Sequence, residues 1–150
     1  MGEKVIYIGA IESQLDDRNR IRIPVKFQDY FGEKLKEVVI CIGAGNCINM
    51  MDTDTFKKWT EEMQQISQGD PRIQLKKLFM ATVSQPGIDT QGRFVLPSIL
   101  KELTGITKDV VFVTEDDRVC IYDKAKYEST ILNIDILNTN LSDIFGQLKL

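Results

Sequence analysis

Leu15-Asp16-Asp17-Arg18-Asn19-Arg20-Ile21-Arg22-Ile23-Pro24 is the stretch of sequence that decides the fold. It returns later in the chain as Ile88-Asp89-Thr90-Gln91-Gly92-Arg93-Phe94-Val95-Leu96-Pro97. Each copy holds an apolar residue, an acid, a turn, an arginine, a short strand-like alternation and a proline. The offset between the copies is constant at 73 residues. An internal repeat of this kind governs the architecture, so we expect two tandem copies of one structural unit.

Each copy has the pattern of a turn between two strands. Aspartate opens such a turn well, and Asn19 tolerates the left-handed backbone conformation that Gly92 would adopt in the second copy. Beyond the turn, the period-two alternation places Arg20 and Arg22 on one face of a strand and isoleucines on the other. Pro24 then suits the first position of a helix.

The first copy is expected to open with short strands and to end with a helix. In order, we expect strands at 4–9, 11–15 and 20–23, a helix from Pro24 that ends at Gly32, strands at 38–42 and 47–51, and a helix from Asp52 or Thr53 to about Ile66. Phe56, Trp59, Met63 and Ile66 form one stripe of this helix, which indicates a core face or an oligomer contact. A connecting helix is expected from Asp70-Pro71 through Phe79.

The same order of elements restarts after the connecting helix. We expect a strand at 80–88, a turn at 89–92, a strand at 93–96, a helix at 97–103 stopped by Gly105, a hairpin of 110–114 and 119–122, and a helix from Asp123 to about Ile136. The predicted fold is α+β, divided into a first repeat at 5–66, the connecting helix at 67–79, a second repeat at 80–136 and a tail at 137–150. A unit of about 70 residues alone has a marginal core, so the repeats are expected to share one core or to complete themselves on another copy.

The spacing D-x-x-x-R has a physical meaning in this context. An acid and an arginine that bracket a tight turn can meet across it, and the carboxylate then fixes the direction of the remaining guanidinium N–H groups. An arginine oriented in this way suits recognition of a phosphate or of the guanine edge. One such turn is usually only an exposed salt bridge. Two copies in the same register, each followed by the same strand and proline, favour a binding function.

This duplicated motif resembles that of the bacterial MraZ proteins, which are tandem members of the SpoVT–AbrB swapped-hairpin superfamily. The resemblance covers roughly residues 5–130. It implies two swapped-hairpin β-barrel repeats with flanking helices, related by a pseudo-twofold axis. It also implies a DNA-binding transcriptional regulator of the division and cell-wall gene cluster, which forms ring-like homo-oligomers on direct repeats in a promoter. A cytoplasmic, nucleoid-associated protein that needs no cofactor is the corresponding expectation.

Carried over by position, the DNA-binding residues fall into two groups. The resemblance assigns the first site to Asp16, Arg18, Arg20 and Arg22, and the second site to Asp89, Gln91 and Arg93. The chain departs from the family pattern at Asn19, where glycine is usual, and at Arg18, where lysine is commoner; it also lacks the histidine often found just before the first motif. The second copy is less basic, so the first is expected to supply more of the electrostatic affinity.

The composition limits the other classes of function. The net charge of −3 argues mildly against nonspecific nucleic-acid binding, although Arg18, Arg20, Arg22 and Lys26 form a local basic patch without an acid among them. With no histidine, a Cys/His zinc site is excluded, and the three cysteines are expected to be reduced and buried. No apolar run approaches a membrane span and no signal peptide is expected. Two alternatives stay open: an assembly partner of the same fold that does not bind DNA, and an enzyme that uses carboxylate or lysine chemistry.

Overall fold

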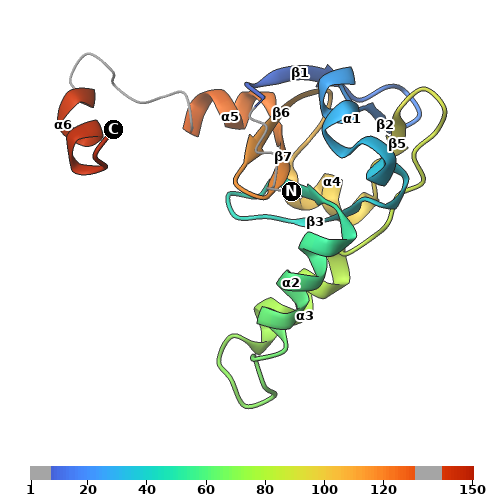
Figure 1. Ribbon diagram of the computed structural model, residues 1–150. Helices are drawn as coiled ribbons and strands as arrows, with labels where there is room; N and C mark the ends of the chain where they lie inside the picture. The colour runs from blue at the N-terminus through green and yellow to red at the C-terminus, as the bar shows by residue number, and fades with distance from the viewer. Residues whose placement is uncertain (1–7, 131–139) are drawn as a thin grey trace.

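The computed structural model describes residues 8–130 and 140–150. Its strands form a five-stranded antiparallel sheet and a separate two-stranded ribbon (Figure 1). The order in the larger sheet is β1-β6-β7-β4-β3. These strands are β1 (Ile11–Gln14), β3 (Val39–Ile42), β4 (Ile48–Met51), β6 (Asp109–Glu115) and β7 (Arg118–Asp123). The ribbon pairs β2 (Arg20–Arg22) with β5 (Arg93–Val95).

Helices surround the sheets and extend away from them. They are α1 (Val25–Phe31), the 3-10 helix η1 (Gly32–Glu37), α2 (Thr53–Met63), α3 (Ile73–Thr82), α4 (Ser98–Thr104), α5 (Lys124–Thr130) and α6 (Leu141–Gln147). Helices α2 and α3 pack through the stacked rings of Trp59 and Phe79 and project from the sheet as a pair (Figure 1). Local signals set several ends: Asp52 caps α2 through the Thr55 backbone N–H, and Gly105 ends α4 in the left-handed conformation.

Strands of the two repeats pair with each other. Strand β1 pairs with β6, β2 with β5 and β4 with β7, so each of these ladders joins one strand from each repeat. The registers match the internal repeat: Ile21 lies opposite Phe94, its counterpart at offset 73. Each sheet therefore contains strands of both repeats.

One hydrophobic core serves both repeats. The cluster holds Ile21 and Phe27 from the first copy together with Phe94 and Phe112 from the second, each at most 1% exposed. The rings of Phe27 and Phe112 lie 5.6 Å apart between centroids. Aromatic pairs of this kind stabilise beyond the area they bury. The expectation of a core shared between the repeats is confirmed within a single chain.

The strand predicted at 80–88 is wrong. Helix α3 continues through Thr82, and the segment that follows contributes only the isolated bridge between Ser84 and Ile40. Two causes favour the helix: Met80 and Ala81 are good helix formers, and its buried end packs on β3, where the Thr82 hydroxyl accepts from the Ile42 backbone N–H at 3.0 Å.

Other boundaries differ from the predictions in smaller ways. Helix α2 ends at Met63 instead of Ile66, Pro24 lies just before α1 instead of inside it, and the 3-10 helix η1 was not predicted. Part of the strand predicted at 4–9 and the end of the helix predicted to reach Ile136 lie outside the described residues. The tail, for which no structure was predicted, contains α6.

Candidate nucleic-acid interface

The first arginine turn is organised by the carboxylate of Asp16. Its Oδ1 accepts hydrogen bonds from the backbone N–H groups of Arg18 and Arg20, both at 2.9 Å. Its Oδ2 accepts from Nε of Arg20 at 2.8 Å. The turn is closed by backbone bonds from the N–H of Asp16 to the Arg20 carbonyl and from the N–H of Asn19 to the Asp16 carbonyl. One carboxylate thus fixes both the turn and the direction of the arginine.

The second turn repeats this arrangement. Asp89 accepts from the backbone N–H groups of Gln91 and Arg93 at 2.9 Å and from Nε of Arg93 at 2.9 Å. The residue that allows the turn to close is Gly92, with φ at 75°, where the first turn has Asn19 with φ at 58°. Asparagine is among the few residues with a side chain that adopt this conformation readily. The predicted equivalence of Asn19 and Gly92 is confirmed.

These contacts favour the ionised form of both aspartates. The backbone N–H of Arg20 is the largest influence that lowers the pKa of Asp16, and it outweighs the opposing effect of burial. The backbone N–H of Arg93 lowers the pKa of Asp89 in the same way. Hydrogen bonds to a carboxylate stabilise its charged form. Each arginine is therefore held by a carboxylate that stays charged at neutral pH.

The guanidinium groups keep donors free for a ligand. Each uses Nε for its aspartate, and the terminal nitrogens have no hydrogen-bond partner among the described residues. The side chains of Arg20 and Arg93 are 23% and 26% exposed. A guanidinium fixed through Nε presents its two terminal nitrogens as a planar pair, which is the geometry that phosphate and guanine accept.

The ribbon of β2 and β5 brings the two turns onto one surface. Ile21 and Phe94 point inward and are buried, so Arg20, Arg22 and Arg93 share the outer face. Because the strands are antiparallel, the turns lie at opposite ends of the ribbon, and Arg20 and Arg93 are offset by roughly 7 Å along the strands and about 5 Å across them. The alternation predicted for β2 is confirmed.

The remaining predicted residues surround this face. Arg18 and Gln91 are exposed at the tips of the two turns, and Lys26 is exposed on α1, just beyond β2. Arg22 lies directly opposite Arg93 in the register of the ribbon. We define the ribbon face as Arg18, Arg20, Arg22, Asp16, Asp89, Gln91 and Arg93.

Two residues beside the turns could not be found from the motif. Lys101 on α4 donates from Nζ to Oδ1 of Asn19 at 2.8 Å, so a residue of the second repeat reaches the first turn. Gln28 on α1 lies against Gly92 of the second turn, where an added Cβ would come within 2.2 Å of its Nε2. The only signal in the sequence is that these two residues are themselves 73 positions apart.

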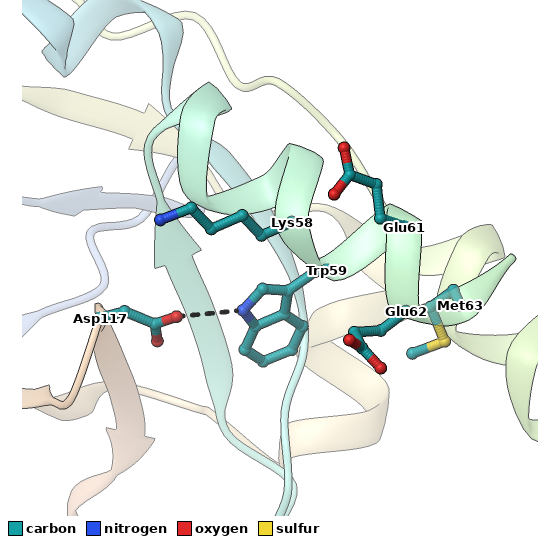
Figure 2. A pocket seen from close by; sticks show the side chains of 6 residues that line it. All are labelled: Lys58, Trp59, Glu61, Glu62, Met63 and Asp117. Atoms are coloured by element: carbon teal, nitrogen blue, oxygen red, sulfur yellow. Dashed lines mark hydrogen bonds between the residues drawn. The ribbon is translucent and has the colours of Figure 1, made fainter. Parts of the chain in front are cut away.

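A second surface feature lies along α2, away from the ribbon. Figure 2 shows the indole of Trp59 reaching toward Asp117 at the β6–β7 turn, and its N–H donates to that carboxylate at 3.4 Å. The guanidinium of Arg118 lies 5.2 Å from the centre of the indole. A groove of about 510 Å³ borders these residues, lined by Lys58, Trp59, Glu61, Glu62, Met63 and Asp117. The indole thus joins α2 to the second repeat. Trp59 belongs to the apolar stripe predicted for this helix, and its contact here is structural.

The three cysteines lie in the interior of the protein. Cys41, Cys47 and Cys120 are buried free thiols, as predicted, and all three lie around the buried amide of Asn49. Burial raises the pKa of Cys41 to about 12. A buried and protonated thiol such as that of Cys41 is a poor nucleophile. The pKa of Cys47 is instead lowered, chiefly by the neighbouring thiol of Cys120.

The described residues contain neither a cluster of metal ligands nor a membrane-spanning helix. Within 8–130 and 140–150, no set of three cysteine or acidic side chains is placed to hold a metal ion. No helix in the same ranges has the length and apolar character needed to cross a membrane.

Comparison with known proteins gives a consistent match over both repeats. A family model described as "MraZ protein, putative antitoxin-like" matches residues 6–77 and again residues 78–142. The chain is 28% identical over 142 residues to the "Transcriptional regulator MraZ" of Lachnoclostridium phytofermentans, covering 94% of this chain and 98% of that protein. It is 31% identical over 131 residues to the protein of the same name from Caldanaerobacter subterraneus, covering 86% and 89%. For the one from Mycoplasmopsis pulmonis the identity is 31% over 128 residues, with 85% of each chain covered.

Proposed function

The chain belongs to the MraZ family, and we propose that it is a transcriptional regulator that binds duplex DNA through its two D-x-x-x-R turns. One observation carries the proposal: both turns hold their arginine by the same three hydrogen bonds, and both arginines lie on the outer face of one two-stranded ribbon. A ribbon of this kind is one of the two elements that the major groove of DNA admits. Regulators of transcription are also what the relatives are named.

The charges of the ribbon face support an anionic ligand. Arg22 and Arg93 lie directly across the ribbon from each other, and like charges in that position destabilise a strand pair. Asp89 pairs with Arg93 at 2.9 Å and reduces this repulsion, but Arg22 has no carboxylate partner among the described residues. Phosphate groups between the two guanidinium groups would remove the repulsion, and each phosphate contact releases a counterion. The ribbon face therefore has four arginines and two aspartates, an excess of positive charge that suits an anionic ligand such as DNA.

We further propose that the protein acts as a ring-like homo-oligomer on direct repeats in the promoter of the division and cell-wall gene cluster. The family resemblance supports this target, and affinity supports the assembly: one chain offers few phosphate contacts, and the net charge is −3. Linking several chains makes each later contact intramolecular and raises avidity. A cytoplasmic, nucleoid-associated location follows from that role. A monomer found by gel filtration with light scattering would contradict the assembly.

The proposal includes a swapped-hairpin fold with pseudo-twofold symmetry. Three pairings support it. Strands β1 and β2 of the first repeat pair with β6 and β5 of the second, and the bridge from Ser84 to Ile40 is the counterpart of the pair Ile11 and Phe112. The axis would pass through the pair Ile21 and Phe94. We retain 5–66 and 80–136 as the two repeats, 67–79 as the connecting segment and 137–150 as the tail; the helix of the connection is α3, which begins later and extends to Thr82.

The DNA-binding proposal is tested by titration of a fluorescent duplex that carries the promoter upstream of the protein's own gene, beside a scrambled duplex, at two salt concentrations. We expect preference for the promoter duplex and a steep dependence on salt. Arg20→Ala and Arg93→Ala should each reduce the preference for the promoter duplex and the dependence of binding on salt. Arg72→Ala is the matched control, because this exposed arginine lies just before α3, away from the ribbon. Equal binding of both duplexes, unchanged by either arginine variant, would contradict the proposal.

A second candidate function is an assembly partner that acts through protein contacts. Exposed apolar side chains on α3 favour it: Leu75 is 68% exposed and Leu78 is 44% exposed. In that case Arg20→Ala and Arg93→Ala would leave regulation in cells intact, whereas Leu75→Ser with Leu78→Ser would abolish it. The reverse pattern supports the DNA-binding function.

A further inference from the structure

Each arginine turn is completed by the opposite repeat. The backbone N–H of Leu96 donates to the Asn19 carbonyl at 2.8 Å, and the N–H of Ile23 donates to the Gly92 carbonyl, also at 2.8 Å. The strand that leaves one turn thus closes the other turn. A side chain from the following helix adds a second contact at each end, and here the two ends differ.

The side chain at the first turn is charged. Lys101 donates from Nζ to Oδ1 of Asn19 at 2.8 Å, and Asn19 lies between Arg18 and Arg20 in the sequence. At the second turn the equivalent position is Gln28, a neutral amide that donates from Nε2 to the Ile23 carbonyl at 2.6 Å. The ammonium of Lys101 therefore adds a cation to one end of the ribbon only.

The surroundings of Lys101 leave its charge available. Its ammonium forms no salt bridge with any carboxylate in the described part of the chain. One N–H is used by Asn19, so two further donors remain. A lysine in the last turn of a helix has a simpler explanation, since it can interact with the helix dipole. However, Nζ extends to the turn of the other repeat and bonds to a side-chain oxygen there.

We propose that Lys101 is a phosphate-contacting residue of the first turn, although it belongs to the second repeat. This inference rests on the proposed DNA-binding function. The first end of the ribbon then contacts phosphate through Arg18, Arg20 and Lys101, whereas the second end has Arg93 with the neutral Gln91 and Gln28. The first turn supplies most of the salt-dependent affinity, and the protein binds DNA with a fixed polarity along the ribbon.

The test is the salt dependence of promoter binding by Lys101→Gln, which keeps an N–H donor for Asn19 and removes the charge. The logarithm of affinity falls against the logarithm of salt with a slope of about −0.9 for each phosphate contacted. Loss of one contact should reduce that slope by about 0.9. Between about 50 and 200 mM salt, the advantage of the wild type over the variant should shrink roughly 3.5-fold.

Two further variants separate charge from position. Lys101→Arg keeps the cation and should keep the slope of the wild type. Lys77→Gln removes one lysine charge from α3, away from the ribbon, and should change nothing. A Lys101→Gln protein that weakens binding equally at both salt concentrations, or leaves it unchanged, overturns the phosphate contact. That result differs from failure of the proposed function, in which the wild type itself shows no salt-dependent preference for the promoter duplex.

Discussion

Gly92 closes the second arginine turn, and two features of its surroundings oppose a larger residue there. Its φ of 75° lies in the left-handed region, and a Cβ on it would come within 2.2 Å of Nε2 and 2.6 Å of Cδ of Gln28. The variant Gly92→Ala therefore meets two separate obstacles. The first is the strain of a left-handed alanine, and the second is displacement of the Gln28 amide from the Ile23 carbonyl, to which it donates at 2.6 Å.

The size of the effect follows from these two obstacles. An L-residue in the left-handed conformation costs about 1–2 kcal/mol. The Gln28 side chain is flexible and can move aside, so the collision itself is relieved, but the hydrogen bond that is lost contributes about 0.5–1.5 kcal/mol. Gly92→Ala should thus lower the free energy of unfolding by about 1.5–3.5 kcal/mol.

The assay is urea unfolding of four proteins at one fixed protein concentration: the wild type, Gly92→Ala, Gln28→Ala and the double variant. In the Gln28→Ala background there is no amide to displace, so Gly92→Ala should cost only the left-handed strain. The double-mutant cycle should therefore show a coupling of about 0.5–1.5 kcal/mol. Fixed concentration matters because oligomer formation shifts apparent stability.

Gly69→Ala is the control for this experiment. A Cβ at Gly69 would meet no atom within 4 Å, and its φ is not in the left-handed region. Its stability should be unchanged within about 0.5 kcal/mol or slightly raised. Additive effects of Gly92→Ala and Gln28→Ala would refute the contact between α1 and the second turn. A Gly92→Ala protein as stable as the wild type would refute the backbone strain as well.

Three other perturbations test the core, the turns and the α2 contact. Phe94→Ala should lower the free energy of unfolding in urea by about 3–5 kcal/mol, because this side chain is 1% exposed. Its neighbour Val95 is 59% exposed, so Val95→Ala should change that free energy by no more than about 0.5 kcal/mol. Equal effects of the two variants would mean that the ribbon is not part of the core. Folding lowers the pKa of Asp16 and Asp89 below the ordinary 3.8, so the stability that these carboxylates contribute is complete above that pH and is lost as the pH falls through the lower folded values. The urea midpoint should therefore stay constant from about pH 7 to 5 and fall by about pH 3, and the fall should be smaller in the double Asp→Asn variant. A large fall between about pH 7 and 5 would contradict this prediction. Trp59→Phe keeps an aromatic ring in the stack with Phe79 and removes the indole N–H, so the free energy of unfolding measured by thermal denaturation should fall by about 0.5–1.5 kcal/mol. An unchanged free energy would mean that the hydrogen bond to Asp117 in the β6–β7 turn contributes nothing to stability.

Short-range signals in the sequence were sufficient for most elements and for both turns. The offset of 73 residues, the aspartate at the start of each turn and the alternation around Ile21 predicted the ribbon strands, because each depends on residues only a few positions apart. Where local signals for a helix and a strand compete, contacts with residues distant in the sequence decide between them. The segment from Met80 combines β-branched residues with good helix formers, and as a helix it places the Thr82 hydroxyl where it accepts from the Ile42 backbone N–H, 40 positions away.

The amino-acid sequence by itself determined that there are two arginine turns, where each begins and which arginine each one holds. Only the tertiary structure decided that β2 pairs with β5, that both turns share one face and that Lys101 serves the turn of the other repeat. The physical reason is separation along the chain. A turn or cap is fixed by hydrogen bonds within four residues, whereas the partner of Asn19 lies 82 positions away and is chosen by how the two repeats bury one core.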